Sequence, residues 1–117
     1  MKIAVLGATG TVGRALTPLL AQQNDVLALS RRPPKDASGL RWATADATDG
    51  AALRKAFAGI DVAYYLVHSL GSRDFEERDR LAAETVAQEA ERAGLRQLVY
   101  LGGLGDQSPQ LSRHLRS

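Results

Sequence analysis

Hydrophobic residues gather in short continuous runs along the chain, with amphipathic segments between them. Such runs are typical of strands that are buried on both faces of a parallel sheet. They lie at residues 3–6, 26–29, 40–43, 62–67 and 97–101. The pattern therefore predicts five strands that are separated by helices or loops.

The first amphipathic segment, residues 12–22, predicts a helix. Its apolar positions share one side at helical spacing, which predicts the face that packs on the sheet; they are Val12, Leu16, Leu19 and Leu20. Pro18 lies inside this segment and favours a kink there, because proline lacks the backbone N–H of a regular helix.

Two further helices are predicted at residues 51–57 and 75–93. Asp49 is a suitable N-cap for the shorter one, and Gly59 follows its end. The longer one has Gly94 after its last apolar position, where helices commonly stop. Its apolar residues recur near helical spacing at Phe75, Ala82, Val86, Ala90 and Ala93.

Strands and helices thus alternate along the chain. Because strand–helix–strand crossovers are right-handed, alternation of this kind gives a parallel sheet with helices on both faces. We predict one α/β domain over residues 1–117 with a Rossmann-type, doubly wound sheet in the order 3-2-1-4-5 and three αβα layers. The ligand crevice is expected at the carboxyl ends of the first and fourth strands, where the strand order reverses.

Composition narrows the classes of function. The chain of 117 residues is 44% hydrophobic and 24% charged, as in an ordinary globular domain. No apolar run approaches the roughly 20 residues that span a membrane. The absence of Cys excludes a disulfide framework and a thiolate metal site. The net charge of +2, without a basic block, gives no support for nucleic-acid binding. We expect a cytoplasmic protein without a metal.

Three glycines follow the first strand, at Gly7, Gly10 and Gly13. In a dinucleotide-binding loop the first permits a tight turn, the second lets a pyrophosphate approach the backbone, and the third lets the helix pack closely on the strand. The free N–H groups of the helix would then face the phosphates. The alternative is a glycine-rich turn that binds nothing. No Lys-Ser or Lys-Thr follows, which argues against a nucleoside-triphosphate loop.

The second strand ends in Ser30, Arg31 and Arg32. At this position, about 20 residues after the glycines, an acid binds the ribose 2′-hydroxyl of NAD, whereas an Arg accommodates the 2′-phosphate of NADP. The two arginines therefore favour NADP(H), with NAD(H) still possible, and argue against an S-adenosylmethionine site. The alternative is that they only keep the loop soluble.

Asp46 follows the third strand and has two interpretations. It can contact an adenine with its carboxylate, or it can simply form a turn, for which Asp is well suited. The sequence leaves both open.

The residues described so far resemble a known family. The stretches "AVLGATGTVG", "SRRP", "ADATD", "GIDVAYYLVHSL" and "AGLRQLVYLGGLG" occur in the order found in the atypical and extended short-chain dehydrogenase/reductases. The nearest group is that of the NmrA-like and epimerase-like NAD(P)-binding proteins. The resemblance spans nearly the whole chain and implies a dinucleotide cofactor, but it does not identify the small-molecule substrate.

The resemblance implies specific cofactor contacts. The three glycines match the phosphate loop of the family, and three neighbours match positions that lend backbone or hydroxyl contacts: Thr9, Thr11 and Val12. Arg31 and Arg32 match the NADP-preferring position, and Asp46 with Ala47 matches the adenine contact. The end of the fourth strand matches the lining of the riboses, at Val67, His68 and Ser69. For His68, a hydrogen-bonded strand end is the plainer alternative.

The catalytic positions depart from the family. Its enzymes commonly place a Ser or Thr after the fifth strand and a Tyr-x-x-x-Lys pair on the next helix. This sequence has Gly-Gly-Leu at 102–104 and no Tyr after Tyr100. His114 stands where the Tyr is sought and could act as a general acid or base. The alternative is a surface His near a fraying terminus.

These observations give two leading hypotheses. The first is an NADP(H)-binding domain of an oxidoreductase whose full-length form transfers a hydride. The second is a non-catalytic sensor or interaction module that binds the dinucleotide without turnover; a remnant that binds nothing is weaker. We also expect the domain to lack the C-terminal substrate region of the family. The apolar strand at residues 98–101 would then lie near an open edge and favour a homodimer through this strand, with the long helix at 75–93 as the alternative interface.

Overall fold

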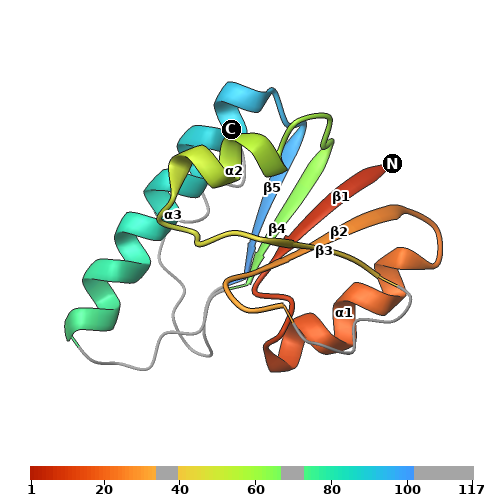
Figure 1. The fold of residues 1–117 in the computed structure, drawn as a ribbon, viewed down its shortest axis with the longest axis horizontal. Helices are drawn as coiled ribbons and strands as arrows, with labels where there is room; N and C mark the ends of the chain where they lie inside the picture. The colour runs from red at the N-terminus through yellow and green to blue at the C-terminus, as the bar shows by residue number, and fades with distance from the viewer. Residues whose placement is uncertain (34–39, 67–72, 102–117) are drawn as a thin grey trace.

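A computed structural model describes residues 1–33, 40–66 and 73–101 of the chain. Its strands form one parallel sheet in the order β3-β2-β1-β4-β5 (Figure 1), which confirms the predicted fold class and strand order. The strands are β1 (Lys2–Leu6), β2 (Asp25–Ser30), β3 (Arg41–Thr44), β4 (Val62–Leu66) and β5 (Gln97–Leu101). The helices of the described residues are α1 (Thr11–Ala21), α2 (Gly50–Ala56) and α3 (Arg73–Ala93).

The strand β1 lies in the middle of the sheet and is buried on both faces. Val5 pairs with Ala28 of β2 on one side and with Tyr64 of β4 on the other. Because all strands run parallel, their carboxyl ends meet at one edge of the sheet, and the chain segments that follow β1, β2, β3 and β4 begin there. This edge is where the sequence predicts the ligand crevice.

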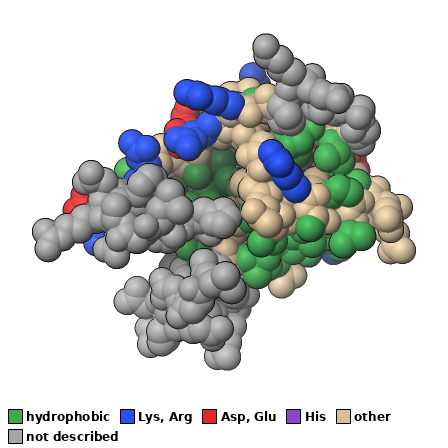
Figure 2. All heavy atoms as spheres, turned by 90° about the horizontal axis from the view of Figure 1, so that it is seen from below, with side chains coloured by type: hydrophobic (Ala, Val, Ile, Leu, Met, Phe, Trp, Pro, Cys, Tyr) green, Lys and Arg blue, Asp and Glu red, His purple; other side chains and the backbone are tan. Residues whose placement is uncertain are grey.

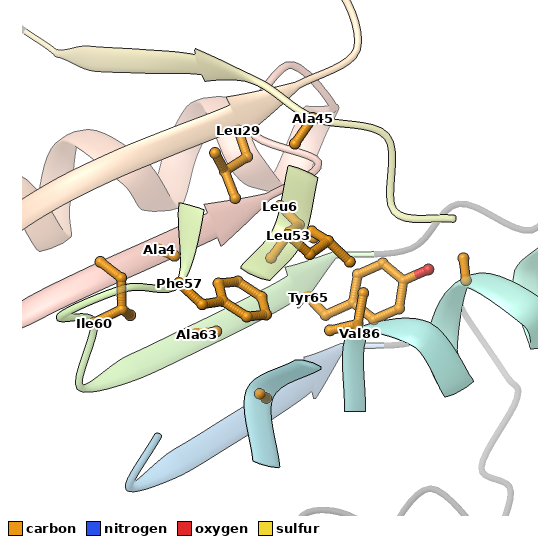
Figure 3. Close-up of a cluster of buried hydrophobic side chains, with 12 residues drawn as sticks. Ala4, Leu6, Leu29, Ala45, Leu53, Phe57, Ile60, Ala63, Tyr65 and Val86 are labelled. Atoms are coloured by element: carbon orange, nitrogen blue, oxygen red, sulfur yellow. The ribbon is translucent and has the colours of Figure 1, made fainter. Parts of the chain in front are cut away.

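The main core lies between the sheet and the α2–α3 layer (Figure 3). Leu53 and Phe57 from the α2 region are completely buried against Leu29 of β2 and Val86 of α3. The apolar positions Ala82, Val86 and Ala90 of α3 are buried, as the helical spacing predicts. Ala93 is exposed, and the side chain of Phe75 lies outside the described residues.

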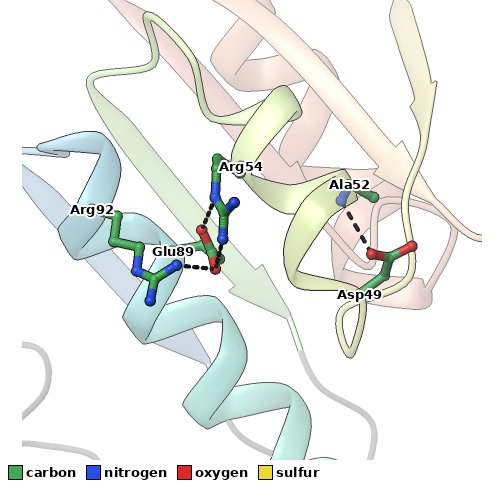
Figure 4. A network of polar contacts seen from close by, with 5 residues as sticks. All are labelled: Asp49, Ala52, Arg54, Glu89 and Arg92. Atoms are coloured by element: carbon green, nitrogen blue, oxygen red, sulfur yellow. Dashed lines mark hydrogen bonds and ion pairs between the residues drawn. The ribbon is translucent and has the colours of Figure 1, made fainter.

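Polar contacts fix the position of α2. Asp49 is its N-cap, and its carboxylate accepts a hydrogen bond from the Ala52 N–H at 3.2 Å (Figure 4), which confirms the predicted cap. Glu89 of α3, with a side chain only 4% exposed, accepts hydrogen bonds from Nε and Nη2 of Arg54 at 3.0 and 3.2 Å. Arg92 adds a 3.6 Å ion pair to the same carboxylate. This cluster joins α2 to α3.

The buried face of α1 differs from the predicted one. Val12 and Leu19 are 50% and 62% exposed, whereas Gly13 and Thr17 face the sheet. A Cβ at Gly13 would lie 2.7 Å from the Cα of Ala8, so the helix approaches the preceding turn more closely than a larger side chain allows. The close approach selects small residues for the buried face, and part of the apolar stripe is left in solvent.

The strand β5 lies at one side of the sheet. Within the described residues it pairs only with β4, and Leu101 at its end is 41% exposed. The predicted homodimer through this strand stays a prediction.

Candidate functional site

A hollow of about 320 Å³ lies at the carboxyl edge of the sheet. Figure 2 views the molecule from this side and shows a recess with hydrophobic side chains at its floor and Lys or Arg side chains near its rim. The turn after β1, the ends of β2 and β4, the segment after β3 and the first part of α3 all contribute to its walls. The recess is therefore at the predicted crevice.

The turn between β1 and α1 requires glycine at two places. Gly7 has a φ of +79°, and a Cβ there would clash with the carbonyl oxygen of Leu66 on β4. A Cβ at Gly13 would clash with the carbonyl oxygen of Gly7. The strand, the turn and the helix are thus held together by close backbone contacts that only glycine permits.

Gly10 is the N-cap of α1, and its extended backbone (φ −74°, ψ 176°) is one that any residue adopts. Its carbonyl accepts the first helical hydrogen bond, from the Arg14 N–H at 2.9 Å. The preceding N–H groups, at residues 11–13, therefore have no helical acceptor. No side chain caps this end and no acidic residue lies in its first turn. Free N–H groups and the positive end of the helix dipole favour an anion here.

The two arginines after β2 are both exposed but differ in position. Arg31 lines the hollow, whereas Arg32 does not, and the N–H of Arg32 donates to Oγ of Ser30 at 3.1 Å. Neither guanidinium forms an ion pair within the described residues. Both remain available for a phosphate.

Asp46 lies in the wall of the hollow and forms a turn. Its Oδ1 accepts hydrogen bonds from the backbone N–H and the hydroxyl of Thr48, at 2.8 and 2.7 Å. These two bonds hold the pKa of Asp46 below its usual value, and the charges of Arg31 and Arg78 lower it further. The turn-forming interpretation is therefore realised in the structure, and the adenine contact stays a prediction.

Two residues in the wall were missed by sequence reasoning. Tyr65 of β4 is 5% exposed and packs edge-to-face on Tyr100 with ring centres 5.3 Å apart. Burial raises the pKa of its phenol well above the usual range. Arg78 of α3 adds a second guanidinium to the hollow. Its sequence context, a charged helix start, gave no signal beyond a solvated face.

The structure brings about half of the sequence-predicted site residues to this hollow. Those in its wall are Gly7, Thr9, Gly10, Arg31, Asp46 and Ala47. Those that are described but lie outside its wall are Thr11, Val12, Gly13 and Arg32. Val67, His68 and His114 lie outside the described residues.

Neither a metal site nor a membrane-spanning helix occurs in the described ranges. No three His, Asp or Glu side chains among those residues come together in a group that could hold a metal ion. None of the helices described has the length and apolarity to cross a membrane.

Comparison with known proteins decides the family. The model of the NAD(P)H-binding family matches residues 7–116, which is nearly the whole chain. The chain belongs to the NAD(P)H-binding family. As a member it has the Rossmann fold of the NmrA-like, epimerase-like and short-chain dehydrogenase/reductase-like superfamily, and its cofactor is a nicotinamide dinucleotide.

Individual relatives of this NAD(P)H-binding domain cover different parts of it. A (4-alkanoyl-5-oxo-2,5-dihydrofuran-3-yl)methyl phosphate reductase of Streptomyces griseus is 36% identical over 92% of this chain. The triphenylmethane reductase of Citrobacter sp., solved with NADP(H), is 25% identical over 99% of the chain with a TM-score of 0.72. A UDP-N-acetylglucosamine 4-epimerase of Bacillus cereus, 20% identical over 94% of the chain, has a TM-score of 0.76 and shares the fold. The chain spans 36%, 43% and 39% of these proteins, respectively.

Proposed function

We propose that this domain binds NADP(H) in preference to NAD(H) and serves hydride transfer by an oxidoreductase. One observation carries the proposal: the helix N-terminus without a side-chain cap and Arg31 at the end of β2 lie at the same hollow. The end of β2 carries no acid. An Arg at this position accommodates the 2′-phosphate of NADP, whereas NAD binding uses an acid. The similarity to the Streptomyces griseus and Citrobacter reductases supports the assignment to an oxidoreductase.

Each part of the site has a proposed role. The amides at the start of α1 bind the pyrophosphate, because they have no helical acceptor and carry the positive end of the dipole. Arg31 and Arg32 bind the 2′-phosphate through charge-assisted hydrogen bonds. Asp46 and Ala47 hold the adenine, and Val67 and His68 line the riboses. A hollow of about 320 Å³ suits the adenosine end of the dinucleotide.

The bound dinucleotide supplies or accepts the hydride at its nicotinamide. The chain's own contribution is binding and orientation. Tyr65 contributes its ring to the wall of the hollow, and burial raises the pKa of its phenol. His114 is the proposed general acid or base within residues 1–117. The substrate is proposed to be a small carbonyl compound or a related molecule.

Calorimetric titration with NADP+ and NAD+ tests the cofactor preference. We expect NADP+ to bind at least about tenfold more tightly, since hydrogen bonds to charged groups contribute about 1.5–3 kcal/mol each. Arg31→Ala and Arg32→Ala should weaken NADP+ binding and leave NAD+ binding nearly unchanged. Arg80→Ala is the matched control, because Arg80 is an exposed arginine of α3 that does not line the hollow. Equal affinity of the unaltered domain for both dinucleotides would contradict the arginine assignment.

The second candidate function is a sensor or interaction module that binds the dinucleotide without turnover. One observation favours it: the segment after β5 begins Gly-Gly-Leu at 102–104, where the resemblance leads us to expect a Ser or Thr. NADPH oxidation measured across a panel of aldehydes and ketones separates the two. Turnover above the buffer rate rules out the sensor, and binding without turnover supports it.

A further inference from the structure

A second and larger hollow, of about 610 Å³, lies at the amino edge of the sheet. It sits between α2 and the neighbouring strands β2 and β3. Short apolar side chains line much of it: Leu27, Ala43, Ala52, Ala56 and Ile60. It shares no residue with the hollow at the carboxyl edge. A dinucleotide held by the glycine loop therefore leaves this hollow open.

The wall that α2 contributes to the hollow carries small apolar side chains. Leu53 and Phe57 are completely buried in the core, whereas Ala52 and Ala56 line the hollow. The facing strand β3 contributes Ala43, which is also small. Apolar surface is thus left uncovered, with room for an apolar group.

The rim of this hollow carries an excess of positive charge. Lys2, Arg41 and Lys55 face one acid, Asp25, and Nη1 of Arg41 contacts both carboxylate oxygens of Asp25 at 3.1 Å. Within the described part of the chain, neither lysine side chain has a carboxylate partner. A further acid lies close by, since the carboxylate of Asp61 accepts a hydrogen bond from the backbone N–H of Lys2 at 2.9 Å.

Strand alternation places these groups on one face. Lys2 is on the same side of β1 as Ala4 and Leu6, which belong to the core beneath α2 and α3. Asp25 and Leu27 occupy the same side of β2, since they are two residues apart. The charged rim and the apolar lining therefore belong to a single recess.

We propose that this hollow at the amino edge binds a small apolar monocarboxylate, such as a medium-chain fatty acid or an aromatic acid. The apolar part lies against Leu27, Ala56 and Ile60, and the carboxylate interacts with the ammonium groups of Lys2 and Lys55. Arg41 is already paired with Asp25, whereas the two lysines have no carboxylate partner among the described residues. Their positive charges therefore favour an anionic ligand. The inference is independent of the cofactor preference, since it uses none of the residues at the carboxyl edge.

Titration of the full chain with octanoate, followed by backbone amide NMR, tests the proposal. We expect saturable shifts at Leu27, Ala43 and Ala56, and none at Gly7 or Gly10. In the series hexanoate, octanoate, decanoate, affinity should rise about threefold to fourfold for each buried methylene. No saturation up to about 10 mM, or shifts confined to the glycine loop, would overturn the site.

Charge variants test the selection of the anion. Lys2→Gln combined with Lys55→Gln should weaken octanoate binding about tenfold, as expected for two exposed ion pairs, and leave 1-octanol binding unchanged. Arg80→Gln is the control cation outside the hollow. Ala56→Phe, which fills the recess, should abolish binding of both probes while NADP+ still binds. Equal binding of octanoate by the double variant and the unaltered chain would refute the role of the lysines.

Discussion

Replacing Gly13 by Ala tests the packing that positions the helix N-terminus at the candidate site. In an ordinary helix interior this change is favourable, because Ala exceeds Gly in helix propensity by about 1 kcal/mol. Here the added Cβ would lie 2.7 and 2.8 Å from Cα and C of Ala8. Both are backbone atoms, so no side-chain rotation can relieve the contact.

The expected cost follows from these distances. The contact at 2.7 Å is about 0.7 Å inside the start of ordinary van der Waals separation, so α1 must move away from the turn. Overpacking of a core typically costs about 1–3 kcal/mol, and the close backbone contacts place this change in the upper half of that range, so the cost outweighs the propensity gain. We expect a net loss of about 1–2 kcal/mol and a fall in Tm of about 5–10 °C for a domain of this size. The shifted amides should also bind dinucleotide more weakly.

Thermal unfolding by circular dichroism, with Ala15→Gly as the matched variant, measures this effect. Ala15 is an exposed position of the same helix, where only propensity acts, so alanine should be more stable than glycine there by about 1 kcal/mol. The Tm with alanine should therefore be lower than with glycine at position 13 and higher than with glycine at position 15. A Gly13→Ala variant with an equal or higher Tm and unchanged dinucleotide affinity would refute the packing argument.

Three further predictions concern other parts of the domain. Thr17 has a buried hydroxyl without a hydrogen-bond partner in the described residues, so Thr17→Val should raise the free energy of unfolding by about 1 kcal/mol. Urea titration measures this change, and a lower free energy of unfolding in the variant would show that the hydroxyl is paired. The hydrogen bonds from Arg54 hold the pKa of Glu89 below the ordinary value of a glutamate. The stabilisation that this pair gives is therefore present above that ordinary value and is lost as the pH falls through the lowered pKa. The Tm of Glu89→Gln should therefore lie below that of the unaltered domain at neutral pH, and this difference should shrink in acid; a gap that is independent of pH contradicts the assignment. Light scattering should detect a homodimer through the side of β5 that pairs with no strand of the described residues, whereas a monomer mass at all concentrations would count against it.

The fold could be predicted from the sequence because local signals agree with one another. Most apolar runs end near a glycine or a polar turn, and Gly59 and Gly94 follow the two later helices, so the observed elements begin within a few residues of the predicted ones. The buried side of α1 could not be predicted in this way. Periodicity assigns large apolar residues to the core, but the close approach at Gly13 buries Thr17 and leaves Leu19 in solvent.

The candidate site was predictable where it depends on strand ends. In a parallel sheet the residues after each strand share one edge, and this places Gly7, Arg31 and Asp46 at one hollow. Arg78 and Tyr65 were not predictable. Arg78 reaches the hollow only because of how α3 lies over the sheet, and Tyr65 lies within an apolar run that reads as core alone.

The position of the helix N-terminus is set by backbone atoms and not by side chains. A Cβ at Gly7 would strike the carbonyl of Leu66, and one at Gly13 would strike the carbonyl of Gly7, so β4, the turn and α1 form a series of close contacts. The amides at the start of α1 are thereby tied to the end of β4, which is one of the two strands where the sheet order reverses. Gly7→Ala should therefore weaken the binding of NADP+ and NAD+ by the same factor, because it displaces the amides that are proposed to bind the pyrophosphate. Loss of Arg31 should act on NADP+ alone. Equilibrium titration of both variants with both dinucleotides separates the two effects, and a Gly7→Ala variant that discriminates between the dinucleotides would contradict this division of roles.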